Sequence, residues 1–129
     1  EEKQQPYPKS PSGLPLVQHS LLLMLSYVAE GKISLEQVVE KMAHAPATCF
    51  GVRERGFIRE GYHADLVLVD MNRPTTVSKE NILYHCGWSP LEGFRFPATV
   101  THTLVNGNVV YENGAVSASV MGQRLLFDR

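Results

Sequence analysis

Histidine side chains are the groups in this sequence best suited to bind a metal ion or to transfer a proton. The five histidines include no His-x-His pair and no pair four residues apart, and we expect no His–carboxylate pair at ligand spacing. His44-Ala45-Pro46 resembles part of an Asp-His-Ala-Pro catalytic motif, but Ala43 stands where the Asp would be. We therefore assign no catalytic residue and no metal ligand to this chain. For His19, in an apolar segment, we expect a buried ring whose hydrogen bonds are satisfied.

The stretch Ser10-Pro11-Ser12-Gly13 is the one candidate for ligand binding. Gly13 follows a rigid proline and has no side chain, so its N–H can approach a ligand closely. Amide groups that lead into a helix suit a carboxylate or a carbonyl oxygen. The alternative is that this stretch is only the turn before the next helix.

Composition narrows the range of partners. With 12 basic and 13 acidic residues and a formal net charge of -1, the chain offers no basic footprint for nucleic acid. Its longest apolar segment, around residues 21–25, is shorter than the roughly 20 residues that a membrane span needs. We therefore expect a small-molecule substrate, no nucleic acid and no membrane. Cys49 and Cys86 lack a paired spacing and are expected to be buried, which together with the lack of a signal-peptide core favours the cytoplasm.

Helices are expected in the first half of the chain. Residues 1–15 contain four prolines and predict a loop. Residues 16–30 are almost entirely apolar and predict a helix enclosed on most sides. Ser34 and Gln37 form the pattern of a capping box before a helix over residues 35–43, and Pro46 predicts a further short helix over 46–51. The apolar stripe of the middle helix consists of Leu35, Val38, Val39 and Met42.

Strands are expected in the second half. Residues 64–69 are apolar on nearly both faces, which predicts a central strand. Residues 99–105 and 108–111 predict a hairpin around Asn106-Gly107, and Asn113-Gly114 predicts a second turn of the same kind. Helices without a complete core of their own, followed by a few strands, indicate a piece of a longer protein.

These segments together resemble the carboxy-terminal portion of cyclic amidohydrolases, and specifically of dihydroorotases. Residues 10–15 resemble the segment after the family's Asp-His-Ala-Pro-His motif. Residues 44–52 resemble its Asn-Pro-Ala and Phe-Gly-Leu motifs, with His44 in place of Asn. Residues 56–70 are similar to its pattern of glycines and Ala-Asp-Leu, with Arg55 in the preceding basic position. Residues 89–93 (Ser-Pro-Leu-Glu-Gly) and 105–107 (Val-Asn-Gly) resemble its closing motifs.

The resemblance implies an α/β fold: the last helices of a (β/α)8 metal-dependent hydrolase barrel over residues 1–55, with a substrate loop at 1–15, and then part of a small β-sandwich domain over 56–129. It implies one or two zinc ions, and a water attack on the cyclic amide of dihydroorotate that yields carbamoyl-aspartate in pyrimidine biosynthesis. The metal ligands would lie outside this chain, which alone is expected to be inactive. The full-length protein is expected to be a cytoplasmic homo-oligomer.

The resemblance also implies two substrate-binding residues. Ser12 and Gly13 correspond to a loop that helps to hold the substrate through its backbone, although many relatives have an aromatic residue at Ser12. A hydantoinase or allantoinase is the alternative within the same chemistry, since Gly13-Leu14-Pro15 also suits hydantoinases. Outside that chemistry, a non-catalytic dihydroorotase-like assembly protein and a free-standing binding module are the other hypotheses.

Overall fold

One long helical segment begins the folded body of the chain. The computed structural model describes residues 3 and 5–128, and in it η2 (Val17–His19) leads directly into α1 (Ser20–Ala29). Gly31 ends the segment with a φ of 70°, and the Lys32 N–H donates to the Tyr27 carbonyl oxygen at 2.9 Å. This is the arrangement of a Schellman cap, in which glycine takes the left-handed position. The helix therefore occupies most of the predicted range.

Only one face of α1 is buried. Leu22, Leu25 and Ser26 are buried, whereas Leu21 and Met24 are half-buried. The prediction of a helix enclosed on most sides is wrong for the part of the chain that the structure describes, because the core residues Val77, Phe96 and Ala98 pack on a single stripe of the helix.

The second helical segment is continuous from residue 35 to residue 49. It comprises α2 (Leu35–Val39), a single π turn η3 (Glu40–His44) and α3 (Ala45–Cys49). The predicted capping box is present, since Gln37 N–H donates to Ser34 Oγ and Ser34 N–H donates to Gln37 Oε1. The predicted break before Pro46 does not occur. Pro46 lacks an N–H and cannot donate a helical hydrogen bond. It lies in the first turn of α3, directly after the π turn, and the local change of hydrogen-bond pattern accommodates it without ending the helix.

The apolar stripe of α2 is less buried than its spacing predicts. Val38 is buried, but Leu35, Val39 and Met42 are each at least 40% exposed. Cys49 and Cys86 are also exposed, contrary to expectation, because Cys49 lies in the last turn of α3 and Cys86 in the loop before β3. The helical spacing of these residues predicted which face of the helix is apolar, but it could not predict whether another part of the chain covers that face.

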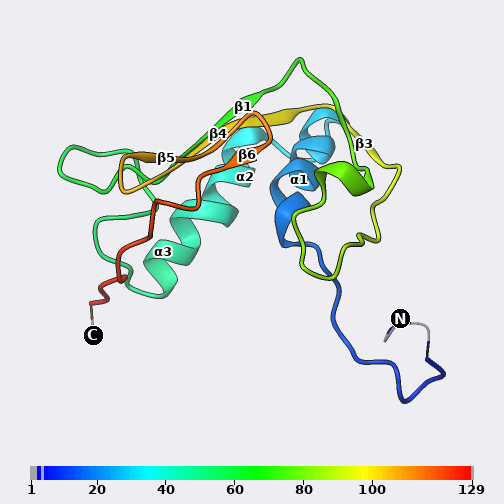
Figure 1. Ribbon diagram of the computed structural model, residues 1–129. Helices are drawn as coiled ribbons and strands as arrows, with labels where there is room; N and C mark the ends of the chain where they lie inside the picture. Colours follow the sequence, from blue (N-terminus) through cyan, green and yellow to red (C-terminus); the bar gives the residue numbers. More distant parts are fainter. Residues whose placement is uncertain (1–2, 4, 129) are drawn as a thin grey trace.

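A four-stranded antiparallel sheet follows the helices, which lie on one side of it (Figure 1). Its order is β1-β4-β5-β6, where β1 is Leu66–Asp70, β4 is Thr99–Val105, β5 is Asn108–Glu112 and β6 is Ala115–Val116. The β4–β5 hairpin turns at Asn106 and Gly107, whose φ values are 51° and 80°, as a type I′ turn requires. Asn113 and Gly114 make the second turn in the same way, so both predicted turns are confirmed.

Strand β1 lies at an edge of this sheet, not at its centre. It pairs only with β4 among the described strands, and its side chains Val67 and Leu68 are 48% and 47% exposed. The expected central position is therefore wrong for residues 3 and 5–128. Val69 packs against the hydrophobic core, whereas Val67 and Leu68 are left partly uncovered by this part of the chain.

The main core lies between α1 and a short ribbon. Strands β2 (Thr75–Thr76) and β3 (Arg95–Phe96) pair with each other, and η4 (Lys79–Asn81) lies in the connection between them. Leu22 and Leu25 of α1 pack with Val77, Phe96 and Ala98. Each such large side chain contributes on the order of 1.5–3 kcal/mol on burial, so this cluster holds the two halves of the chain together.

The carboxy-terminal segment leaves β6 and returns to the helical half (Figure 1). Val52 and Phe127 form an antiparallel bridge. Arg53 N–H donates to the Leu126 carbonyl oxygen at 2.9 Å, and Asp128 N–H donates to the Gly51 carbonyl oxygen at 2.8 Å. Within the described residues, no helix combines the length and the apolar character that crossing a bilayer requires.

Candidate functional site

The predicted substrate residues lie on an exposed loop that projects from the body of the chain (Figure 1). Ser12 and Gly13 are both exposed, and Gly13 has a φ of 94° with no atom within 4 Å of the position a Cβ would take. Residues 11–16 form neither helix nor strand, and the helix begins only at Val17. Because Gly13 lies four residues before the first helical residue, its amide is not part of the helix N-terminus, and that part of the expectation is corrected.

The loop makes its hydrogen bonds with itself. Lys9 N–H donates to the Pro6 carbonyl oxygen at 2.8 Å, and Ser10 Oγ donates to the Lys3 carbonyl oxygen at 3.2 Å. The Lys3 ammonium group donates to the Pro11 carbonyl oxygen. Among the described residues, no hydrogen bond joins Ser12 or Gly13 to another polar side chain. Their role in substrate binding stays a prediction.

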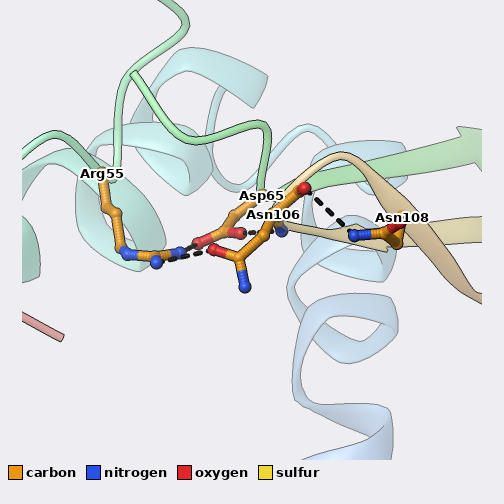
Figure 2. Close-up of polar contacts among 4 residues, drawn as sticks. All are labelled: Arg55, Asp65, Asn106 and Asn108. Atoms are coloured by element: carbon orange, nitrogen blue, oxygen red, sulfur yellow. Dashed lines mark hydrogen bonds and ion pairs between the residues drawn. The ribbon is translucent and has the colours of Figure 1, made fainter. Parts of the chain in front are cut away.

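A second polar cluster joins the helical half to the sheet. Arg55 follows α3, Asp65 precedes β1, and Asn106 lies in the β4–β5 turn (Figure 2). The Arg55 guanidinium donates to the Asp65 carboxylate and, at 2.7 Å, to the Asn106 side-chain oxygen. The Asn106 N–H donates to the other Asp65 oxygen at 2.8 Å. Both of these guanidinium nitrogens donate to residues of the chain itself, so we interpret the cluster as a structural contact between the two halves and not as a ligand site.

The electrostatics of Asp65 agree with that role. Burial raises the pKa of the Asp65 carboxyl, but the Asn106 N–H and the Arg55 guanidinium together lower it further, so the pKa lies below its ordinary value of 3.8. The carboxylate is therefore charged at neutral pH and opposes the buried Arg55 charge. Sequence reasoning placed Arg55 in a basic motif position but did not find its partners, because Asn106 is 51 residues away.

The histidines differ from one another in ways the sequence did not predict. The His19 ring is buried, with 3% of the residue exposed. Its Nδ1 has no hydrogen-bond partner among the described residues, so the prediction that its hydrogen bonds are satisfied is wrong for this part of the chain. Burial lowers the pKa of His19 below 6.5. His44 Nδ1 lies 3.3 Å from Glu40 and His102 Nε2 lies 3.3 Å from Glu112, which are His–carboxylate pairs that were not expected.

These pairs do not make a metal centre. Across residues 3 and 5–128, no three His, Cys, Asp or Glu side chains come together in a way that could hold a metal ion. The zinc implied by the resemblance therefore does not fit the described part of this chain.

A cleft of about 640 Å³ separates α1 from the sheet. Its walls are mostly apolar, with Leu21 and Leu22 on the helix side and Val67, Val100 and Val110 on the sheet side. Neither Ser12 nor Gly13 lines it, so the cleft and the candidate substrate loop are separate features.

Comparison with known proteins places this arrangement in a family. The model of the amidohydrolase family matches residues 22–111, which include most of α1, the core, the Arg55–Asp65–Asn106 cluster and nearly all of the β4–β5 hairpin. The chain belongs to the amidohydrolase family. It is similar to curated dihydroorotases: 36% identical over 115 residues to that of Pyrococcus furiosus and 39% identical over 111 residues to that of Halobacterium salinarum.

This amidohydrolase chain is also similar to solved structures of hydantoinases. A D-hydantoinase matches with a TM-score of 0.78 and 31% identity over 84% of the chain, and the L-hydantoinase of Arthrobacter aurescens matches with a TM-score of 0.77 and 33% identity over 85%. These matches cover 24% and 25% of the two structures, and the chain spans 28% and 26% of the two dihydroorotases. The chain therefore corresponds to about a quarter of its relatives and has the fold of that quarter.

Proposed function

We propose that this chain is the carboxy-terminal part of a dihydroorotase, which interconverts dihydroorotate and carbamoyl-aspartate in pyrimidine biosynthesis. In the forward reaction water adds to the amide carbon of the ring, the carbon–nitrogen bond breaks, and a second carboxylate forms. The observation that carries the proposal is the similarity to dihydroorotases, which extends over 89% of the chain at 36% identity for one relative. The hydantoinase structures support the wider class of cyclic amide hydrolysis.

In this proposal the helices are the last helices of a (β/α)8 barrel, and the sheet is part of a small β domain. A zinc ion, when bound, supplies an activated water. Because the described residues contain no group of three possible ligands, the metal would be held by parts of the enzyme outside this chain. We extend the proposal to a cytoplasmic enzyme that is a homo-oligomer.

The contribution of this chain to the chemistry would be substrate binding by the loop at Ser12 and Gly13. Dihydroorotate carries a carboxylate that dihydrouracil and hydantoin lack, and a backbone N–H is a good donor to a carboxylate. The open space around Gly13 leaves room for such a group to approach the backbone. A donor at this position would favour dihydroorotate over the neutral cyclic amides.

The test is the substrate profile of the full-length enzyme with zinc. Hydrolysis of dihydroorotate, dihydrouracil, hydantoin and allantoin is measured as kcat/KM under the same conditions. We expect dihydroorotate to exceed each neutral substrate by at least about 100-fold, the size of effect that one charged hydrogen bond and its positioning produce. A preference for hydantoin or dihydrouracil would replace the proposal with a hydantoinase.

Two further outcomes decide the other hypotheses. A preference for allantoin would identify an allantoinase. A full-length protein that binds zinc poorly and turns over none of the four substrates would support a non-catalytic assembly protein, as would the absence of a His-x-His motif from its remaining sequence.

A further inference from the structure

Gln18 connects two distant segments through three hydrogen bonds. Its backbone N–H donates to the Tyr84 hydroxyl oxygen at 2.8 Å, and its side-chain Nε2 donates to the Asn81 carbonyl oxygen at 2.7 Å. Its Oε1 accepts from the Leu83 N–H at 2.9 Å. The partners are 63 to 66 residues away in the sequence. One residue, through its backbone and its side chain, therefore ties the first turn of the helical segment to the end of η4 and the loop that follows it.

The neighbouring residue reinforces this connection. The His19 ring stacks on Phe96 with a centroid separation of 5.9 Å and meets the Tyr84 ring edge to face at 5.9 Å. Tyr84 therefore contacts the same turn twice, through its hydroxyl group and through its ring. Fixing a glutamine side chain costs up to about 2 kcal/mol of conformational entropy, which the hydrogen bonds must offset.

This turn is where the loop with Ser12 and Gly13 leaves the body of the chain. Gln18 is five residues beyond Gly13, and Pro15 lies between them. Because proline fixes its own φ and keeps the preceding residue extended, the connection is stiff. Leu16 has helical backbone angles and residues 17 and 18 belong to η2, so Gly13 lies closer to Gln18 than the roughly 17 Å that five extended residues would span. A rotation of about 5° at the turn would therefore move Gly13 by at most about 1.5 Å.

We propose that Gln18 is a positioning residue, which with Tyr84 sets the place of the substrate loop. This rests on the proposed function, in which the loop contacts dihydroorotate. The loop's own hydrogen bonds are internal, so its direction relative to the body depends on the turn at residues 16–19. Displacing a binding group by about 1 Å can cost up to about 100-fold in catalytic efficiency, so loss of this anchor should weaken substrate binding.

The experiment uses the full-length enzyme with the variants Gln18→Leu and Tyr84→Phe. Gln18→Leu removes the two side-chain hydrogen bonds at similar volume, and Tyr84→Phe removes the acceptor of the Gln18 N–H but keeps the ring. Ser20→Ala is the matched control, because Ser20 Oγ donates to the Val17 carbonyl oxygen at 3.0 Å within the same turn. We expect KM for dihydroorotate to rise about tenfold in Gln18→Leu and about threefold in Tyr84→Phe, with kcat changed less than about twofold. Ser20→Ala should change neither constant.

Amide hydrogen exchange of residues 5–16 gives a second readout that needs no substrate. We expect faster exchange at these residues in both variants and unchanged exchange in Ser20→Ala. An unchanged KM in both variants would overturn the positioning role, as would a fall in kcat without a rise in KM. If Gln18→Leu does not fold, Tyr84→Phe decides the question alone. An inactive wild-type enzyme would refute the proposed function instead, and the exchange measurement would still test the anchor.

Discussion

The Arg55 guanidinium donates to the Asp65 carboxylate, and this contact joins the end of the helical half to the start of the sheet (Figure 2). Only 8% of the Arg55 side chain is exposed, against 33% for Asp65. A buried guanidinium needs a partner charge, and Asn106 supplies both a further acceptor and an N–H to hold the carboxylate. The β4–β5 turn is thus fixed against the loop after α3 by polar contacts.

Arg55→Leu should destabilise the protein by about 2–3 kcal/mol, because Asp65 and Asn106 lose their common donor while partly desolvated. The change is measured as the free energy of unfolding in urea on the full-length enzyme. Arg53→Leu is the matched control: its ion pair with Asp128, at 3.4 Å, is exposed on both sides and should contribute less than about 1 kcal/mol. Equal effects of the two substitutions would contradict a structural role for the cluster.

The Arg55–Asp65–Asn106 cluster should make the free energy of unfolding depend on pH in acid. The pKa of Asp65 is lower in the folded than in the unfolded protein, so its charge stabilises the fold above its ordinary pKa of 3.8, and this contribution is lost as pH falls through the folded value. The difference in unfolding free energy between wild type and Asp65→Asn should therefore be constant from pH 7 to pH 5 and shrink below about pH 4. A difference that stays constant down to pH 3 would contradict this interpretation.

Gly56 lies so close to Ala43 and Ala47 that a residue with a side chain would not fit there. Its φ is 79°, and a Cβ there would overlap the Ala47 Cβ and lie 2.9 Å from the Ala43 carbonyl oxygen. Gly56→Ala should cost about 3 kcal/mol, from the left-handed conformation and the overlap together. Gly31→Ala, at a φ of 70° with open space around it, carries only the conformational cost of about 1 kcal/mol. The unfolding temperatures of the two variants should differ by several degrees, with Gly56→Ala the lower.

Local chemistry accounts for the elements that the sequence predicted well. The Ser34–Gln37 capping box and the turns at Asn106-Gly107 and Asn113-Gly114 are set by residues within a few positions of one another. Their hydrogen bonds and φ values need no distant partner, so sequence spacing was sufficient to predict them.

Properties that depend on distant segments were not predictable. The apolar pattern of β1 indicated burial on both sides, but its neighbours in the sheet are set by chain topology. Gln18 carried no motif, and its partners are more than 60 residues away. For Ser12 and Gly13 the sequence supplied a hypothesis that the exposed loop leaves open to experiment.

His19 should make the protein less stable in mild acid. Burial lowers its pKa in the folded state, so the unfolded chain binds the proton first, and stability declines as pH falls below about 6.5. His19→Phe keeps an aromatic ring against Phe96 and cannot be protonated, so the loss of unfolding temperature between pH 7.5 and pH 5.5 should be smaller in this variant. His85→Phe, at an exposed position, is the control and should retain the wild-type loss.

Gly13→Val tests the substrate loop directly. A side chain at this position would intrude where the backbone N–H meets dihydroorotate, so KM should rise at least about tenfold with a smaller change in kcat. The substitution also forces a branched residue into a φ of 94°, which costs about 1–2 kcal/mol wherever it occurs. Gly61→Val separates the two effects, because Gly61 has a φ of 82° and open surroundings but lies outside the loop. A rise in KM confined to Gly13→Val assigns the loop to substrate binding, and equal KM values in the two variants would remove that assignment.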